Sequence, residues 1–188
     1  MISNISFKSS IRPVTLSDFR KETSKIPDKN FVGYPWSVND SIKAQSSYTK
    51  DVADCTVCGI TDGANVFLMH LSPENEINHS LFILRQIIAR NVDLNDKNLQ
   101  AILIGSKPTT KSSDIYNKLC ELINSFNIPF SELKFSKSRV NVAYFSNKDE
   151  WIVASNDIDK LLKFNNRKED VLKNSFNKVE ISEFDEIV

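Results

Sequence analysis

Apolar positions along the chain follow two spacings, one typical of β-strands and the other of helices. Alternating or continuous apolar runs, which favour strands, fall at residues 51–60, 64–71, 100–105, 133–136, 140–145 and 151–155. Helical spacing appears at residues 79–90, at 112–126 and from Asn156 onward. The resulting order is β-β-α-β-α-β-β-β, with a further helix after it. This order predicts an α+β fold in which helices pack on a mixed β-sheet.

The pattern also divides the chain into three segments. Residues 1–48 are polar, rich in Ser, Thr and Lys, and interrupted by prolines, so we expect a loosely structured lead-in. Within it, the aromatic residues of 34–36 are expected to pack on the core. Residues 49–155 hold the predicted sheet and form the central domain. Residues 156–188 are expected to form a C-terminal extension that is first helical and then acidic.

Two of the strand-like runs are separated by Asp62-Gly63, a dipeptide that favours a tight hairpin turn. If these two residues form the turn, Cys55 and His70 each lie seven residues from it and face each other directly. A symmetric four-residue loop keeps this pairing, whereas a three-residue loop shifts it. Cys58 lies three residues beyond Cys55, so in a regular strand its side chain points to the opposite face.

A cysteine opposite a histidine is a candidate catalytic pair. Directly opposed residues have Cβ atoms about 5 Å apart, close enough for the imidazole to take a proton from the thiol. The resulting thiolate is an activated nucleophile. Cys55 and Cys58 also form a C-x-x-C motif, but redox motifs of this kind normally open a helix. A zinc site would need a second ligand pair, and only His70 and His79 are available. We therefore favour neither the redox nor the zinc interpretation of this motif, and we expect Cys120 to serve packing.

Composition narrows the classes of partner. The chain has 188 residues, is 40% hydrophobic, and balances 24 Lys and Arg against 24 Asp and Glu. A net charge of zero gives no broad attraction to nucleic acid or to anionic lipid. Three cysteines without framework spacing argue against a disulfide scaffold and favour a reducing cytosol. No apolar stretch is typical of a signal peptide or of a membrane span, so we expect a soluble protein. We also expect it to be a monomer.

The residues around Cys55 have a recognisable spacing. Thr49 precedes Cys55 by six residues, and His70 follows it by 15. Residues 71–73 (Leu-Ser-Pro), the strand ending in Gly and Ser at 105–106, the Ile-Pro at 128–129 and the closing strand pair at 139–154 come in the same order as in one family. On these residues, segment 46–155 resembles the CheD-type glutamine deamidases and the catalytic domains of cytotoxic necrotising factors and related lethal-factor deamidases.

The chain also departs from that family at two places. Ala53 and Asp54 stand where the family usually has a glycine and a small residue before the cysteine, and residues 136–138 (Ser-Lys-Ser) replace a glycine pair of the CheD branch. These departures place the chain nearer to the toxin-like branch. Glycine before the cysteine lets backbone N–H groups approach the reacting carbonyl, and Asp54 adds negative charge beside the thiolate.

The resemblance implies a function. Cys55, its pKa lowered by protonated His70, would attack the side-chain amide of a glutamine on a protein surface, and Thr49 would orient His70 or the substrate. The products would be glutamate and ammonia, and neither a metal nor an organic cofactor would be required. We expect the protein either to be delivered into a host cell as an effector or to act in the bacterial cytoplasm. The alternatives are a CheD-type enzyme that modifies chemoreceptors, a binding module in which Asp54 has removed catalysis, and a thiol protease or transglutaminase that uses the same pair.

Overall fold

A computed structural model describes residues 8–33, 44–73, 77–105, 110–135, 139–164, 171 and 176–181. Its helices are α1 (Leu16–Thr23), α2 (Ile77–Asn91), α3 (Thr110–Ser125) and α4 (Asn156–Phe164). Its strands are β1 (Ser10–Pro13), β2 (Ser46–Val52), β3 (Thr56–Thr61), β4 (Val66–Leu71), β5 (Gln100–Gly105), β6 (Phe130–Phe135), β7 (Val140–Phe145), β8 (Glu150–Ala154) and β9 (Phe176–Ile181). The aromatic residues at 34–36, which were expected to pack on the core, lie outside the described residues.

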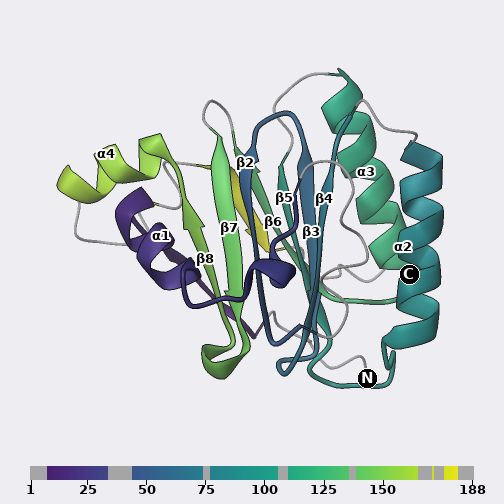
Figure 1. Ribbon diagram of the computed structural model, residues 1–188. Coiled ribbons are helices and arrows are strands. Elements are labelled where there is room, and N and C mark those ends of the chain that lie inside the picture. The colour runs from purple at the N-terminus through teal and green to yellow at the C-terminus, as the bar shows by residue number, and fades with distance from the viewer. Residues whose placement is uncertain are drawn as a thin grey trace.

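The strands form two sheets that pack face to face (Figure 1). One sheet has the order β1-β8-β7-β2, and the other has the order β4-β3-β5-β6-β9. Each is mixed, because β1 runs parallel to β8 and β5 runs parallel to β6, while the remaining pairs are antiparallel. Helices α2 and α3 lie on the outer side of the five-stranded sheet, and α1 and α4 lie on the side of the four-stranded sheet (Figure 1). The α+β class is therefore confirmed.

The prediction of one sheet is wrong, and the reason lies at residues 53–55. The sequence predicts one strand over residues 51–60, but the chain bends at 53–55 between β2 and β3. Strand β2 pairs with β7 in one sheet, whereas β3 pairs with β4 and β5 in the other. The bend therefore carries the chain from one sheet to the other, and Cys55 stands at this crossing.

Three apolar layers hold the fold together. The inter-sheet core fills the space between the sheets, with Val142, Tyr144 and Trp151 facing Val57 and Leu68. A second layer lies between the five-stranded sheet and helices α2 and α3, and a third lies between the four-stranded sheet and α1. Burial of such apolar surface is the main favourable term in folding.

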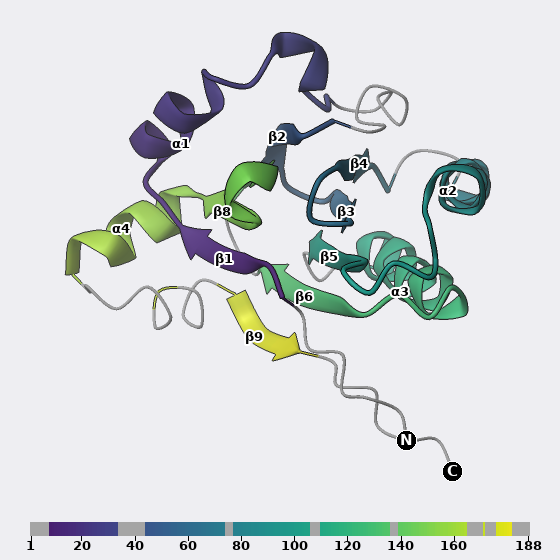
Figure 2. The same cartoon turned by 90° about the horizontal axis from the view of Figure 1, so that it is seen from below.

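Strands β2 and β4 lie next to each other although they belong to different sheets (Figure 2). The Val66 N–H donates a hydrogen bond to the Ala44 carbonyl at 2.8 Å, which ties the entry of β2 to the start of β4. Further along β2, the Val32 N–H donates to the Tyr48 carbonyl at 2.8 Å. Two segments, residues 31–32 and β4, therefore lie beside β2.

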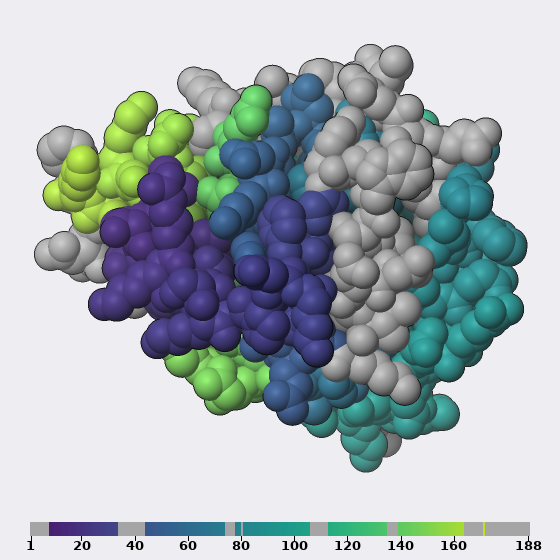
Figure 3. Space-filling model, in the orientation of Figure 1, coloured from purple at the N-terminus to yellow at the C-terminus, as the bar shows by residue number. Residues whose placement is uncertain are grey.

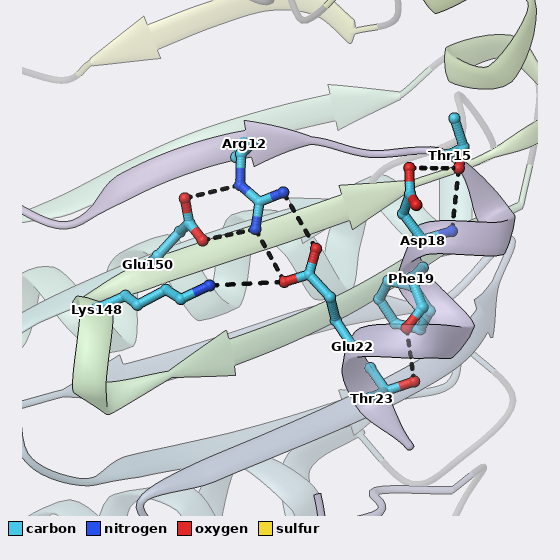
Figure 4. A network of polar contacts seen from close by, with 8 residues as sticks. All are labelled: Arg12, Thr15, Asp18, Phe19, Glu22, Thr23, Lys148 and Glu150. Carbon is cyan, nitrogen blue, oxygen red and sulfur yellow. Dashed lines mark hydrogen bonds and ion pairs between the residues drawn. The ribbon is translucent and has the colours of Figure 1, made fainter. Parts of the chain in front are cut away.

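The N-terminal segment is more ordered than its composition predicts. Strand β1 joins the four-stranded sheet beside β8, and Thr15 caps α1 by accepting a hydrogen bond from the Asp18 N–H at 3.0 Å. Arg12 forms ion pairs with Glu150 at 2.8 Å and with Glu22 at 3.0 Å (Figure 4). Hydrogen bonding to Glu150, and then to Glu22, raises the pKa of the Arg12 guanidinium above its ordinary value despite partial burial.

The C-terminal segment adds α4, as expected, and also a strand that the sequence did not predict. Strand β9 pairs antiparallel with β6 at the edge of the five-stranded sheet. No helix within the described part of the chain is long and apolar enough to cross a membrane.

Candidate active site

The hairpin that carries the candidate pair has a different register from the predicted one. His70 of β4 lies opposite Val57 of β3, and Cys55 precedes the first residue of β3. The loop has four residues, 62–65, and joins the paired residues Thr61 and Val66. The predicted direct pairing of Cys55 with His70 is therefore wrong by two positions.

The side chain of Asp62 explains this register. Its Oδ1 accepts hydrogen bonds from the Ala64 N–H at 2.8 Å and from the Asn65 N–H at 2.6 Å. Asp is favoured at the first position of a turn because its carboxylate can accept from backbone N–H groups further along. Asp62 thus opens the loop instead of occupying its centre, and Gly63 takes the next position with a φ of 87°. The hairpin is centred one residue later than predicted.

A slip of two positions leaves the side chains on the same face, because strand side chains alternate with a period of two. Val57, opposite His70, belongs to the inter-sheet core together with Cys55. His70 shares this face with Val66 and Leu68, its alternate neighbours along β4. The common face that the sequence predicts for Cys55 and His70 therefore holds, although His70 is a diagonal and not a direct neighbour of position 55 in the hairpin.

The three cysteines have different surroundings. Cys55 is 8% exposed and stands in the bend between the sheets. Cys58 lies on the opposite face of β3, beneath α2 and α3, as predicted. Burial raises the pKa of Cys58 to about 12 and that of Cys120 to about 12, so both thiols are protonated at neutral pH.

Thr49 reaches His70 from the facing sheet. The Thr49 hydroxyl oxygen lies 2.8 Å from His70 Nδ1, and it also lies 2.6 Å from the Val32 carbonyl oxygen. Both side chains are buried, with His70 5% exposed and Thr49 fully covered. The family resemblance implies that Thr49 orients His70 or the substrate through its hydroxyl or its backbone carbonyl, and the structure brings the hydroxyl to the ring.

This pair of contacts fixes the form of the imidazole. A carbonyl oxygen only accepts, so the single hydroxyl proton of Thr49 is donated to Val32. The Thr49 oxygen must then accept from His70, which places the ring proton on Nδ1. In the neutral ring the lone pair consequently lies on Nε2, the nitrogen that remains to accept a proton.

Burial also sets the charge of His70. It lowers the pKa of His70 to about 4, an effect that the charge of Asp51 opposes. The imidazole is therefore neutral at pH 7, and the expectation of a protonated His70 in the resting protein is wrong for this reason. A neutral ring with its lone pair on Nε2 is the form that can act as a base.

The backbone at Cys55 is held closely from the end of β5. A Cβ atom added at Gly105 would lie 2.9 Å from the Cys55 carbonyl oxygen and 2.9 Å from the Thr56 Cα. Gly105 has a φ of 157°, which side chains rarely tolerate. Glycine is thus required here for β5 to pass against the bend that carries the cysteine.

Sequence reasoning missed two residues of this site. Val32 acts through its backbone carbonyl, which every residue has, so no side-chain pattern identifies it. Gly105 was seen only as the end of a strand, although a glycine after a continuous apolar run is a signal for close backbone approach. Within the described ranges, no three His, Cys, Asp or Glu side chains gather as a metal site.

Comparison with models of protein families finds no match for this chain, and comparison with curated proteins finds none either.

Proposed function

We propose that the protein is a cysteine-dependent hydrolase that deamidates glutamine side chains on a protein substrate, with the fold of the CheD and necrotising-factor deamidases. The observation that carries this proposal is the Thr49–His70 contact, which leaves the basic nitrogen of a buried, neutral imidazole as Nε2. Cys55 shares the inter-sheet face with that histidine and is supplied by the neighbouring bend. The spacing of Thr49, Cys55 and His70, and the order of the strands and helices around them, resemble those deamidases and also support the proposal.

The reaction begins with proton transfer from the Cys55 thiol to His70 Nε2. The thiolate sulfur attacks the amide carbon of the glutamine side chain and forms a carbon–sulfur bond. Imidazolium then gives its proton to the departing nitrogen, the carbon–nitrogen bond breaks, and ammonia leaves a thioester on Cys55. His70 next takes a proton from water, whose oxygen attacks the thioester carbon. The proton returns to the sulfur as the glutamate product is released.

Two features of the site serve this sequence. Thr49 is a positioning residue, because it holds the Nδ1 proton and so keeps the lone pair of the neutral ring on Nε2. A backbone N–H group of the 53–55 bend would stabilise the oxyanion that forms during attack. Gly105 packs closely against the backbone of Cys55 and Thr56 at the end of this bend.

The burial of Cys55 and His70 favours a substrate whose reacting group is narrow. With Cys55 8% exposed, a slender side chain such as that of glutamine suits the site better than an extended peptide backbone. This observation favours deamidation over protease action. A transglutaminase would form the same thioester but resolve it with an amine instead of water.

The test compares three forms of the full-length protein: wild type, Cys55→Ser and Cys58→Ser. Each is incubated with glutamine-containing protein mixtures, and ammonia release is measured together with the mass of tryptic peptides. Deamidation adds about one dalton at each modified glutamine, because an amide nitrogen is replaced by oxygen. We expect wild type and Cys58→Ser to show the same modified sites and Cys55→Ser to show none. Cys58→Ser is the matched control, since it removes a thiol only three residues from Cys55, on the face of β3 that lies away from the inter-sheet core.

Equal mass changes with wild type and Cys55→Ser would contradict the proposal, as would the absence of any modified glutamine. Loss of activity in Cys58→Ser to the same extent as in Cys55→Ser would also contradict it. Incorporation of an added primary amine in preference to water would assign the protein to the transglutaminases instead.

A further inference from the structure

A basic groove opens at the same end of the molecule as the candidate pair. It has a volume of about 740 Å³ and is lined by four cationic side chains: Arg20, Lys50, Arg139 and Lys160. They come from α1, β2, the residue before β7, and α4. Figure 3 shows purple α1, yellow-green α4 and blue β2 adjoining on one face of the molecule. We call this surface the basic groove.

The register of β2 and β7 places the basic groove next to the site. Val52, the last residue of β2, pairs with Val140, the first residue of β7. Asp51 and Arg139, which line the groove, each lie one residue from this pair. The bend with Cys55 begins directly after Val52, so the groove and the cysteine share one end of the strand pair.

The part of the basic groove nearest the site is formed by a β-bulge that a hydrogen bond ties to the neighbouring strand. Strand β2 bulges between Thr49 and Val52, and Asp51 there adopts a φ of 58°. The Asp51 N–H donates to Asn141 Oδ1 at 3.0 Å, which ties the bulge to β7. The same bulge separates Thr49, whose hydroxyl contacts His70, from the groove-lining Asp51.

The charges of the groove are only partly balanced from within. Arg139 meets Asp51 at 4.0 Å with both side chains more than 70% exposed, and Lys160 meets Asp157 at 3.8 Å. Arg20 and Lys50 are exposed to solvent, and Lys50 lies over the Tyr48 ring at 5.2 Å. Four cations against two carboxylates leave a local excess of positive charge in a chain whose net charge is zero.

We propose that the basic groove docks an acidic segment of the protein substrate and thereby presents a nearby glutamine to Cys55. This inference rests on the proposed deamidase function and adds the chemistry of the substrate to it. Carboxylates of the substrate pair with Arg20, Lys50 and Arg139, and the glutamine enters the bend beyond Asp51. Charge complementarity of this kind mainly sets specificity and the rate of association.

The test uses a fluorescein-labelled peptide with one glutamine followed by a run of glutamates, and a matched peptide with serines in place of the glutamates. Binding is followed by fluorescence anisotropy for the wild type, for Cys55→Ser, and for the triple variant Arg20→Gln, Lys50→Gln, Arg139→Gln. We expect the triple variant to bind the acidic peptide about tenfold more weakly, as the loss of three exposed ion pairs predicts. Cys55→Ser should bind as tightly as wild type.

The chain offers a control of equal charge. A second groove of about 710 Å³ lies at the other end of the β2–β7 pair and is lined by Lys25, Lys29 and Lys148. The triple variant Lys25→Gln, Lys29→Gln, Lys148→Gln loses the same three charges, and we expect it to bind the acidic peptide as the wild type does. Equal weakening in both triple variants, or none in either, would overturn the docking proposal. Tighter binding of a single-stranded RNA of equal charge, lost in the first triple variant, would overturn it as well.

Measurement of ammonia release with the two peptides separates this proposal from the proposed function. Tight binding of the acidic peptide without ammonia from any glutamine would leave the docking groove standing and remove the deamidase. Ammonia released at the same rate from the acidic and the serine peptide would overturn the docking proposal and leave the deamidase standing.

Discussion

Replacement of Thr49 by valine tests how His70 is held. Valine has nearly the same shape as threonine but no hydroxyl, so it removes the contacts to His70 Nδ1 and to the Val32 carbonyl at once. Both partners are buried, and each unsatisfied buried polar group costs about 1–3 kcal/mol. We therefore expect Thr49→Val to lower the free energy of unfolding by about 3 kcal/mol, measured by urea denaturation.

The more specific expectation concerns the ring itself. In the wild type, the ¹⁵N chemical shifts of His70 should show a proton on Nδ1 and a lone pair on Nε2. In Thr49→Val, the proton should redistribute between the two nitrogens, whereas Thr49→Ser should keep the wild-type form. Ser47→Ala is the matched control, because Ser47 lies on the same strand as Thr49 and donates a hydrogen bond from its hydroxyl to the Asn30 carbonyl at 2.7 Å. An unchanged His70 tautomer in Thr49→Val would show that Thr49 does not hold the ring proton on Nδ1.

Three further predictions concern the stability of the fold. Below about pH 6.5 His70 is protonated in the unfolded chain, but in the folded chain it stays neutral down to about pH 4. The free energy of unfolding of the wild type should therefore fall by about 3 kcal/mol as the pH is lowered from about 6.5 to about 4, and His70→Asn should remove this dependence on pH. A Cβ atom at Gly59 would overlap the ring of Trp151, so Gly59→Ala should lower the free energy of unfolding by about 3 kcal/mol. Adding Trp151→Phe should restore part of this loss, and an unchanged thermal stability in Gly59→Ala would contradict this packing. Arg12→Met should cost about 3 kcal/mol because it leaves Glu150 without its Arg12 partner and Glu22 with only the longer pair to Lys148. Lys148→Met, which loses that one pair at 3.9 Å, should cost less than about 1 kcal/mol; equal costs in urea denaturation would count against the network in Figure 4.

Elements whose burial is regular could be predicted from the sequence. Strand β5 has the predicted bounds, 100–105, because a continuous apolar run is typical of a strand covered on both faces. Helix α3 buries Ile115, Leu119 and Ile123 on one stripe, as its spacing predicts. In these segments the local pattern and the tertiary environment agree.

Elements set by long-range pairing could not be predicted in the same way. Strand β1 exists because it lies beside β8, and the carbonyl of Val32 reaches Thr49 because residues 31–32 pair with Tyr48. The hairpin register depended on whether Asp62 begins or occupies the turn, a choice made by its side-chain hydrogen bonds. The shared face of Cys55 and His70 survived this error because the slip was even.

The most direct measurement of the central claim is the rate at which iodoacetamide alkylates Cys55 near neutral pH, followed by mass spectrometry of each cysteine peptide. Burial raises the pKa values of Cys58 and Cys120 to about 12, so both thiols are protonated under these conditions and should react slowly. We expect Cys55 to react first, and we expect His70→Asn to slow its alkylation by about tenfold or more while leaving the other two cysteines unchanged. Equal rates for Cys55 in the wild type and in His70→Asn would contradict the claim that this imidazole activates the thiol.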